Sequence, residues 1–236
     1  ISQQETTRIL VRGMAHEIKN PLGGIRGAAQ LLDRELNSED QREYTRVIID
    51  EADRLRSLVD RMLGPNKALK LAPTNIHEIL ERVGTLLEAE SKGRLNFERD
   101  YDPSIPEFKG DKEQLIQAFL NIARNAMEAA FENQGGHSSE ESPTITFRTR
   151  TLRQFTIGNR RHKLVCRVDV IDNGPGIPPE LVQNIFYPMI SGRASGTGLG
   201  LSITQSIIGQ HRGLVECESE PGRTDFIIFL PLEDTP

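Results

Sequence analysis

Two apolar stripes with helical spacing dominate the first part of the chain and constrain its fold more than any other feature. In the first stripe the apolar residues recur at intervals of three and four, which places them on one face of a helix spanning residues 1 to about 36. The stripe consists of Met14, Ile18, Leu22, Ile25, Ala29, Leu32 and Leu36. Most of the stability of such a helix comes from packing of its apolar face, so a partner element is expected.

The second stripe follows a polar break at residues 37–40 and repeats at heptad-like intervals of 4, 3, 4 and 3. It consists of Ile48, Ala52, Leu55, Val59 and Met62. Two such helices joined by a short loop form a helical hairpin, which has too little core on its own. We therefore expect residues 1–63 to pair with a second copy in a homodimeric four-helix bundle. The alternative is a hairpin that packs on the chain's own downstream domain.

The remainder of the chain has the mixed pattern of an α+β fold. We expect a linker at residues 64–73, which contain two prolines and little periodicity, and a second domain at 74–232. The pattern predicts helices near 76–86, 111–131 and 199–210, and strands near 95–101, 144–151, 163–171, 214–219 and 226–230. Helices interspersed with mostly antiparallel strands predict a two-layer α/β sandwich, with helices covering one face of the sheet.

Composition and charge exclude several functions. The formal net charge of −5 argues against general binding to nucleic acid, which needs a basic surface. No apolar run approaches the roughly 18 residues of a membrane span, and no signal-peptide pattern is present. Cys166 and Cys217 form no CxxC pair, and no cluster has the spacing of a zinc site. We expect two reduced thiols in a cytoplasmic protein without structural metal.

A histidine with distinctive neighbours lies in the first helix. His16 is followed directly by Glu17, and Asn20 lies four positions on, so His16 and Asn20 share one helix face. An imidazole, a carboxylate and an amide in this arrangement could take up a phosphoryl group and later direct a water at it. A lone histidine on a helix is more often a solvated or packed side chain, so this segment alone does not decide between the two.

The helix expected at 111–131 carries a pair of amides. Asn121 and Asn125 are four residues apart on one face, opposite a face that contains Leu115, Phe119 and Ile122. Two amide oxygens can hold a hydrated Mg²⁺, which prefers oxygen ligands and keeps some of its waters. The alternative is two solvated asparagines.

The strand that ends near residue 171 runs into a glycine-containing segment. Asp172 at the strand end is expected to expose a carboxylate that accepts a hydrogen bond from the exocyclic amine of adenine. Gly174 and Gly176 let the backbone approach a flat ring or adopt positive φ. A tight turn is the alternative.

A second glycine-containing segment, residues 196–200, opens the helix expected at 199–210. Glycines at a helix N-terminus expose amide donors at the positive end of the helix dipole, which suits phosphates. The segment is neither a Walker A loop nor a Rossmann fingerprint. Upstream of it, Arg193 and its small neighbours are typical of a flexible lid that closes over phosphates.

The order of these segments is more specific than any one of them. His16-Glu-x-x-Asn-Pro, Asn121-x-x-x-Asn-Ala, Asp172-Asn-Gly-Pro-Gly-Ile-Pro, Phe186-Tyr-Pro and Gly196-Thr-Gly-Leu-Gly-Leu follow one another along essentially the whole chain. This order resembles the H, N, G1, F and G2 boxes of the sensor histidine kinases of two-component systems. The longer runs at 16–32 and 186–193 are similar to the nitrogen-regulation kinases of that family.

The resemblance implies an architecture. A dimerisation and phosphoacceptor hairpin is followed by an ATP-binding domain of the Bergerat type, the histidine kinase-like ATPase fold. In the nitrogen-regulation kinases an N-terminal PAS sensor domain comes first. The sequence contains neither that domain nor an initiator Met, so we expect it to be part of a longer protein.

Carried over to matching positions, the resemblance also implies roles for residues. His16 accepts the γ-phosphoryl group of ATP, Glu17 orients the ring and takes its proton, and Asn20 positions a water for dephosphorylation of the partner. Asn125, together with Asn121, binds Mg²⁺. The implied ATP contacts are Asn121, Asn125, Asp172, Gly174, Gly176, Arg193, Gly196, Thr197, Gly198, Leu199 and Gly200. Arg193 stands where many relatives have lysine.

The implied activity is that of a sensor protein histidine kinase. It transfers phosphoryl from ATP to its own histidine, then to an aspartate of a response regulator, and it also acts as a phosphatase toward that regulator. The implied partners are a second copy of the chain, an NtrC-like response regulator and a PII-like signalling protein.

Two other functions fit parts of the sequence. ATPases of the same fold, such as gyrase, Hsp90 and MutL relatives, place a glutamate one turn before the Mg²⁺-binding asparagine to activate water. That position is Asn121 here, so hydrolysis is expected to be poor. The other alternative is a scaffold that binds nucleotide without histidine phosphorylation.

Overall fold

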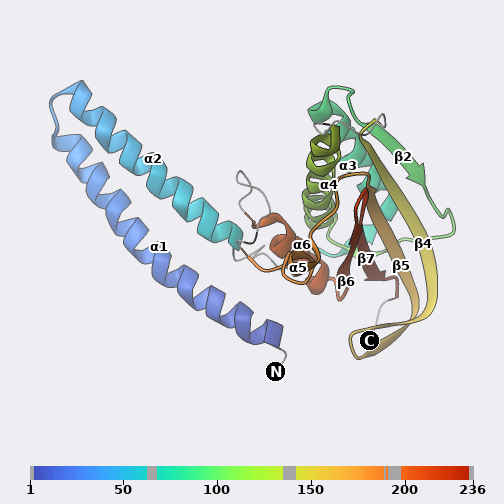
Figure 1. The fold of residues 1–236 in the computed structure, drawn as a ribbon. Coiled ribbons are helices and arrows are strands. Elements are labelled where there is room, and N and C mark those ends of the chain that lie inside the picture. The colour runs from blue at the N-terminus through green and yellow to red at the C-terminus, as the bar shows by residue number, and fades with distance from the viewer. Residues whose placement is uncertain (1–2, 63–67, 135–141, 189, 191–197, 234–236) are drawn as a thin grey trace. The chain divides into compact units, whose positions relative to one another are not determined.

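The computed structural model describes residues 3–62, 68–134, 142–188, 190 and 198–233. The chain divides into two compact units, Ile1–Asn66 and Lys67–Pro236 (Figure 1). Within the described residues, no helix has both the length and the apolar character needed to cross a membrane.

The first unit is the expected helical hairpin. Helix α1 (Gln3–Glu35) continues through its internal proline, and helix α2 (Glu39–Met62) runs back alongside it (Figure 1). Leu22 and Ala29 of α1 are buried in the hairpin, as are Ala52 and Val59 of α2. The prediction of two amphipathic helices joined by a short loop is therefore confirmed.

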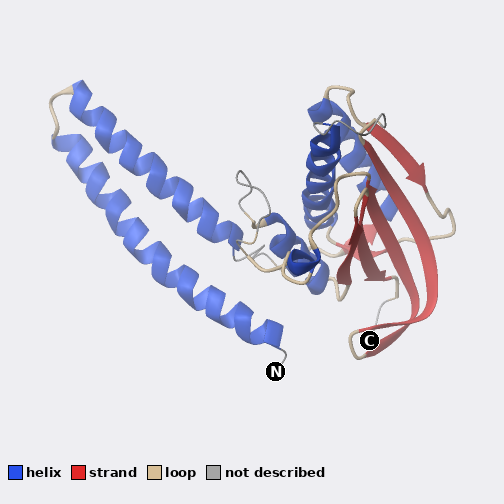
Figure 2. Cartoon of the chain, in the orientation of Figure 1, coloured by secondary structure: helices blue, strands red, loops and turns tan. Residues whose placement is uncertain are grey.

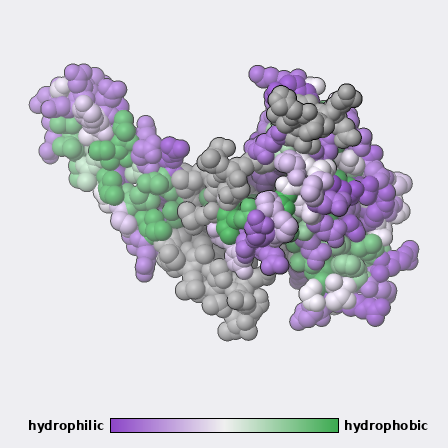
Figure 3. Space-filling model, viewed as in Figure 1, coloured by the Kyte–Doolittle hydropathy of each residue, from purple (hydrophilic) through white to green (hydrophobic). Residues whose placement is uncertain are grey.

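Several members of each apolar stripe stay exposed within one chain. Relative exposures are 41 % at Ile18, 51 % at Ile25 and 48 % at Leu32 on α1, and 43 % at Ile48 and 47 % at Leu55 on α2. Figure 3 shows hydrophobic side chains gathered along the hairpin. Burying one such side chain stabilises a protein by about 1.5–3 kcal/mol, so these exposed residues favour contact with another apolar surface.

The second unit contains a five-stranded mixed sheet in the order β2-β4-β5-β7-β6. Strand β2 is parallel to β4, and the other neighbouring pairs are antiparallel. The strands are β2 (Asn96–Asp100), β4 (Thr144–Ile157), β5 (Arg160–Asp172), β6 (Leu214–Glu220) and β7 (Arg223–Pro231). A separate antiparallel pair consists of β1 (Ala72–Thr74) and β3 (Phe108–Gly110).

Helices cover one face of the sheet, as predicted for a two-layer sandwich (Figure 2). The long helices are α3 (Ile76–Ser91), α4 (Lys112–Gln134) and α6 (Gly200–Gln210), and α5 (Pro179–Val182) is a single turn. Alternate residues of β5, such as Val168 and Val170, face Ile228 and Phe226 of β7 on this side. All four are buried, and they share one face of the sheet because alternate residues of a strand point the same way.

The β4–β5 hairpin is longer than the strands expected at 144–151 and 163–171. Its turn lies between the two strands predicted there, and Gly158 in the turn has a φ of +61°. The added length is stabilised by a second apolar cluster, in which Phe155 stacks on Phe229 with ring centroids 4.7 Å apart. The cluster contains Leu152, Phe155, Ile157, Val165, Leu214, Ile227 and Phe229. Arg153 and Gln154 interrupt the alternation that would have extended the predicted strand.

Other element boundaries also shift. Ala72 and Pro73, which the sequence assigned to the linker, lie in β1. Helix α4 continues to Gln134, beyond the expected end near 131. Its start is as expected, because the carboxylate of Asp111 accepts a hydrogen bond from the amide of Gln114 at 3.2 Å.

Two histidines make the stability of the second unit depend on pH. Burial lowers the pKa of His77 and of His211 below the ordinary 6.5, so the folded chain resists their protonation. The unfolded chain protonates both as pH falls below 6.5, and it then binds more protons than the folded chain. The free energy of unfolding is therefore expected to decrease as pH falls from about 7.5 to 5.5.

Urea denaturation at several pH values measures this dependence. His77 Nε2 lies 3.0 Å from Thr149 Oγ1, and its ring stacks on Tyr101. The variant H77N should lose part of the slope in this window, since it removes one of the two groups. An unchanged slope in H77N would show that other groups control it.

Candidate functional site

A cavity of about 470 Å³ opens in the second unit, large enough for a small organic ligand. Helix α4, the loop after β5, α5, the start of α6 and strand β7 line it. Of the sequence-predicted residues within the described part of the chain, the cavity wall contains Asn121, Asn125, Asp172, Gly176, Gly198 and Gly200. Residues as far apart in the sequence as Asn121 and Thr224 thus meet at one site.

The amide pair lies on the α4 wall of this cavity. Asn121 and Asn125 are both half-buried there, and helix anchors such as Phe119 and Ile122 fill the core on the opposite side. Asn121 Nδ2 donates to the Gly200 carbonyl at 3.2 Å. With its amide nitrogen engaged in this way, Asn121 has its carbonyl oxygen left for a ligand.

Sequence reasoning missed the rest of this helix face. Arg124, Glu128, Ala129 and Glu132 also line the cavity. Arg124 is held at the cavity edge by Glu90, whose carboxylate accepts from Arg124 Nε at 3.0 Å and from Nη2. That hydrogen bond lowers the pKa of Glu90. Glu128 and Glu132 repeat at helical spacing from Asn121 and Asn125, so the spacing itself could have identified them.

Asp172 ends β5 inside the cavity. The sequence predicted an exposed carboxylate, and this was wrong, because Asp172 is only 3 % exposed. It sits between its cross-strand neighbours Ile145 and Thr224, and its Oδ1 accepts from the amide of Gly174 at 2.9 Å. The carboxylate is therefore a fixed acceptor with little access to bulk water.

Glycine is required at two positions beside this aspartate. A Cβ at Gly174 would lie 2.6 Å from Asp172 Oδ1 and 2.7 Å from Ala129 Cβ. Gly176 has a φ of +87°, and a Cβ there would lie 2.6 Å from the Glu220 carbonyl oxygen. Gly174 packs behind Asp172, whereas Gly176 is on the cavity wall. Both positions thus support the loop around the aspartate.

The start of α6 forms another part of the wall. Gly198, Gly200 and Leu201 face the cavity, and α6 begins at Gly200. Leu199 is 4 % exposed, so its side chain belongs to the core. The predicted ATP contacts Arg193, Gly196 and Thr197 lie outside the described residues.

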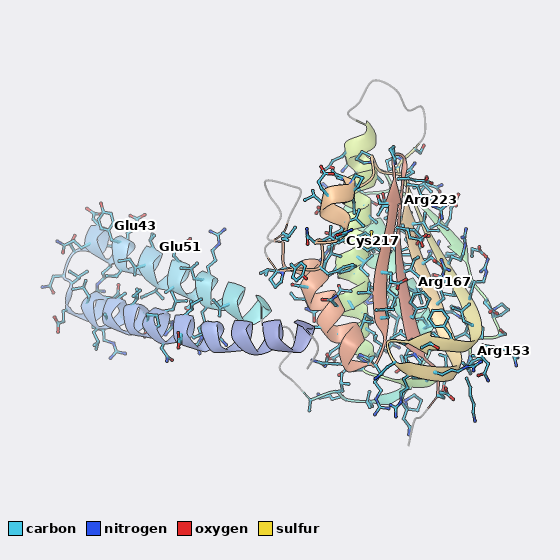
Figure 4. All side chains as sticks on the ribbon, turned by 60° about the horizontal axis from the view of Figure 1, so that its bottom comes forward. Glu43, Glu51, Arg153, Arg167, Cys217 and Arg223 are labelled. Carbon is cyan, nitrogen blue, oxygen red and sulfur yellow. The ribbon has the colours of Figure 1, made fainter. Side chains whose placement is uncertain are left out.

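Strand β7 contributes two wall residues that the sequence did not reveal. Thr224 is paired with Asp172, and Phe226 is paired with Val170 and with Cys217. Cys217 lies on the sheet (Figure 4), and burial raises the pKa of its thiol to about 12. The thiol therefore stays protonated and is a poor nucleophile.

The predicted phosphoacceptor group lies in the other unit. His16, Glu17 and Asn20 are all on α1, and Glu17 and Asn20 are exposed. The side chain of His16 lies outside the described part of the structure.

The arrangement suits a magnesium nucleotide. A buried carboxylate can accept from a base amine, the glycine-rich start of α6 offers amides to phosphates, and two amide oxygens offer hard ligands to Mg²⁺. In the described residues, no group of three or more His, Cys, Asp or Glu side chains forms a separate metal site. The two asparagines therefore suit a hydrated Mg²⁺ that is bound mainly by the nucleotide phosphates. They do not suit an ion bound by protein ligands alone.

Comparison with protein families agrees with this class of site. Residues 110–234 match the model of histidine kinase-, DNA gyrase B- and HSP90-like ATPases, and residues 7–68 match the His kinase A phosphoacceptor domain. The chain therefore belongs to the family of histidine kinase-, DNA gyrase B- and HSP90-like ATPases.

Within that family the chain is similar to the sensory histidine kinase/phosphatase NtrB. Identity is 54 % to the protein of Vibrio alginolyticus over 231 residues, covering 98 % of this chain and 64 % of that protein. It is 41 % to the protein of Rhizobium meliloti, covering 92 % of this chain and 56 % of that one. The chain thus spans less than two thirds of the length of these relatives.

Solved structures with the same fold include a histidine kinase, ThkA. ThkA in complex with the response regulator TrrA has a TM-score of 0.58 and 26 % identity, covering 98 % of this chain and 62 % of that one. The catalytic domain of ThkA has a TM-score of 0.56 and 27 % identity, covering 69 % of this chain and 96 % of that one. ShkA in complex with AMPPNP has a TM-score of 0.62, covers 96 % of this chain and 46 % of that one, and at 24 % identity supports the fold alone.

Proposed function

We propose that this chain is the kinase and phosphatase core of a sensor histidine kinase. It transfers the γ-phosphoryl group of ATP to His16 and then to an aspartate of a response regulator, and it also dephosphorylates that regulator. The observation that carries the proposal is the cavity in which Asn125, Asp172 and Gly200 converge. The similarity to NtrB and the match of residues 7–68 to a phosphoacceptor domain support it.

Each group of cavity residues is proposed to bind a different part of the nucleotide. Asp172 accepts from the adenine amine, and Gly174 and Gly176 shape the pocket around it. The amides of Gly198, Leu199 and Gly200 bind the phosphates. Arg193, Gly196 and Thr197 complete the phosphate contacts. The buried position of Asp172 strengthens its hydrogen bond to the base, because little water competes for it.

Magnesium is proposed to bind through Asn125 and Asn121. The ion supplies charge neutralisation for the transferred phosphoryl group. The carbonyl oxygen of Asn121, whose amide nitrogen donates to Gly200, fits this role.

At the acceptor, a neutral imidazole nitrogen of His16 attacks the γ-phosphorus. The bond from phosphorus to the bridging oxygen breaks, and ADP leaves. Glu17 orients the ring and takes the proton that the ring loses. A neutral histidine suits this step at pH 7, because its ordinary pKa is about 6.5.

A water-activating ATPase is less well supported by the site. Position 121, one turn before Asn125, holds an amide whose nitrogen is engaged with Gly200. A side-chain amide is too weak a base to remove a proton from water, so transfer to histidine is favoured over hydrolysis.

The partners follow from the same proposal. A second copy covers the exposed stripe of the hairpin, which would build a four-helix bundle from residues 1–63. The response regulator is proposed to be NtrC-like, with a PII-like protein controlling the balance of kinase and phosphatase. We place the chain in the cytoplasm, where its two free cysteines stay reduced. The linker is proposed at 64–73 and the catalytic domain at 74–232.

Labelled ATP tests the proposal directly. The chain should incorporate γ-phosphate in a bond that is stable in alkali and labile in acid, and a matching regulator should remove the label. Release of free phosphate without labelled protein would favour the ATPase instead. If the chain binds nucleotide but neither becomes labelled nor releases phosphate, the result would favour a scaffold that binds nucleotide without histidine phosphorylation.

The phosphatase role predicts a specific effect at Asn20. Changing Asn20 to Ala should slow dephosphorylation of the phosphorylated regulator by roughly tenfold to a thousandfold, as when one positioning hydrogen bond is lost. Labelling of His16 should remain, because Asn20 positions water rather than nucleotide. Dephosphorylation at the normal rate in N20A would remove Asn20 from the mechanism.

A further inference from the structure

Helices α4 and α6 are joined by hydrogen bonds from the cavity outward. At the cavity, Asn121 Nδ2 donates to the Gly200 carbonyl at 3.2 Å. Further along, the buried hydroxyl of Thr204 lies 3.2 Å from the Ala118 carbonyl of α4 and 3.0 Å from the Gly200 carbonyl of its own helix, and its single proton is shared between these two acceptors. The two helices also pack against each other, so a shift of one moves the other.

The end of this interface away from the cavity is a node formed by Asp111 and His211. The backbone amide of Asp111 donates to His211 Nε2 at 2.9 Å, and His211 Nδ1 donates to the Ile207 carbonyl at 2.8 Å. The ring must therefore be neutral with its proton on Nδ1. Burial lowers the pKa of His211, which favours this neutral form.

The side chain of Asp111 connects the node to the segment before β1. Asp111 Oδ2 accepts from the amide of Lys70 at 2.9 Å, while Oδ1 caps α4 through the amide of Gln114. Burial alone would raise the pKa of Asp111, but these hydrogen bonds outweigh it and lower the pKa. Lys70 precedes β1 in the chain, on the segment that leads from the hairpin into the catalytic domain.

We propose that the Asp111–His211 node couples occupancy of the nucleotide cavity to the linker. The proposal rests on the proposed ATP-binding function. Helix α6 begins at the cavity and ends at Gln210, directly before His211, so a nucleotide that holds Gly200 also holds the far end of the helix. Asp111 and His211 are not among the described residues that line the cavity, so they do not touch the nucleotide. They act as positioning residues.

Hydrogen exchange in residues 68–74 of the full chain measures this coupling. The probe is a non-hydrolysable ATP analogue with Mg²⁺. In the unmodified protein we expect the analogue to slow exchange of this segment by about fivefold or more, the lower end of ordinary coupling between sites. The amide of Lys70 reports most directly, because its acceptor is Asp111 itself.

Two variants break the node in different ways. D111N has a single carbonyl oxygen, which can cap α4 or accept from Lys70 but cannot do both as Asp111 does. H211F has a ring of similar size without either hydrogen bond. In both, the response of residues 68–74 should fall below about twofold, while nucleotide still binds.

The neighbouring variant K112Q is the matched control. Lys112 pairs with Glu78 through exposed side chains, and the pair bonds neither to Lys70 nor to His211. K112Q should therefore respond as the unmodified protein does. If a node variant fails to fold, T204V breaks the middle bond of the same interface and should weaken the response.

A fluorescent nucleotide measured on each protein separates the two possible failures. If the unmodified chain binds no nucleotide, the ATP-binding proposal is wrong. If it binds nucleotide while residues 68–74 do not respond, the coupling is wrong. Equal responses in D111N, H211F and the unmodified chain would also overturn it.

Discussion

Replacing His16 with glutamine is expected to abolish incorporation of the γ-phosphoryl group of ATP into the chain. Glutamine keeps a polar side chain of moderate size, but it has no ring nitrogen with a lone pair that can attack phosphorus. Loss of the attacking group should reduce labelling by on the order of a thousandfold or more, as in other enzymes that use covalent catalysis. Acid-labile, alkali-stable label on the purified protein is the measurement.

Nucleotide binding is the control for this variant. The cavity belongs to the second compact unit, whereas His16 is in the first, so H16Q should bind a fluorescent nucleotide as tightly as the unmodified chain. The variant N20A should still accept label. Label that persists in H16Q would move the acceptor to another residue and would leave the proposed chemistry without its nucleophile.

Features set by local spacing were predictable from the sequence. The helical hairpin follows from the intervals between apolar residues, and the shared face of Asn121 and Asn125 follows from one helical turn. The structure brings Asn125, Asp172 and Gly200 to one cavity, as the order of motifs implied. The hairpin and the shared face need only the period of a helix, whereas the common site was implied by the resemblance of the motif order to the histidine kinases.

Features set by pairing between distant segments were not predictable. Thr224 and Phe226 reach the cavity because β7 pairs with β5 in one register, and a shift of one residue would turn both side chains away. The same pairing buries Asp172, which the strand-end position alone made look exposed. The node at Asp111 joins residues 70, 111 and 211, and no local pattern connects them.

The face of the sheet that the helices do not cover gives a second example of residues that the sequence alone could not bring together. Asp169 and Asp225 are buried there, and each pairs with an arginine two residues away in its own strand, Arg167 and Arg223. Figure 4 shows these two arginines on the sheet. Burial, followed by the nearby charge of Asp169, raises the pKa of Asp225. Sequence alternation identifies the face of each charge, but only the register brings the carboxylates together.

Changing Gly174 to Ala is expected to remove most of the nucleotide affinity. The added Cβ would lie 2.6 Å from Asp172 Oδ1, 2.7 Å from Ala129 Cβ and 2.9 Å from the Ala129 carbonyl carbon. Backbone of α4 cannot give way cheaply, and Asp172 is held by the amide of Gly174 itself, so the carboxylate must move. A displacement of about 1 Å at a group that orients a ligand can cost about a hundredfold, and we expect a loss of that size in G174A.

G209A is the matched control, because it also adds one methyl group to a glycine, but at a position of α6 that does not line the cavity. A Cβ at Gly209 would have no atom within 4 Å. Titration with a fluorescent ATP analogue should therefore give G209A an affinity within a few-fold of the unmodified chain, because the added methyl group displaces nothing. Equal losses in the two variants would mean that affinity depends on glycine flexibility rather than on the position of Asp172. A loss confined to G174A would tie adenine binding to the buried carboxylate.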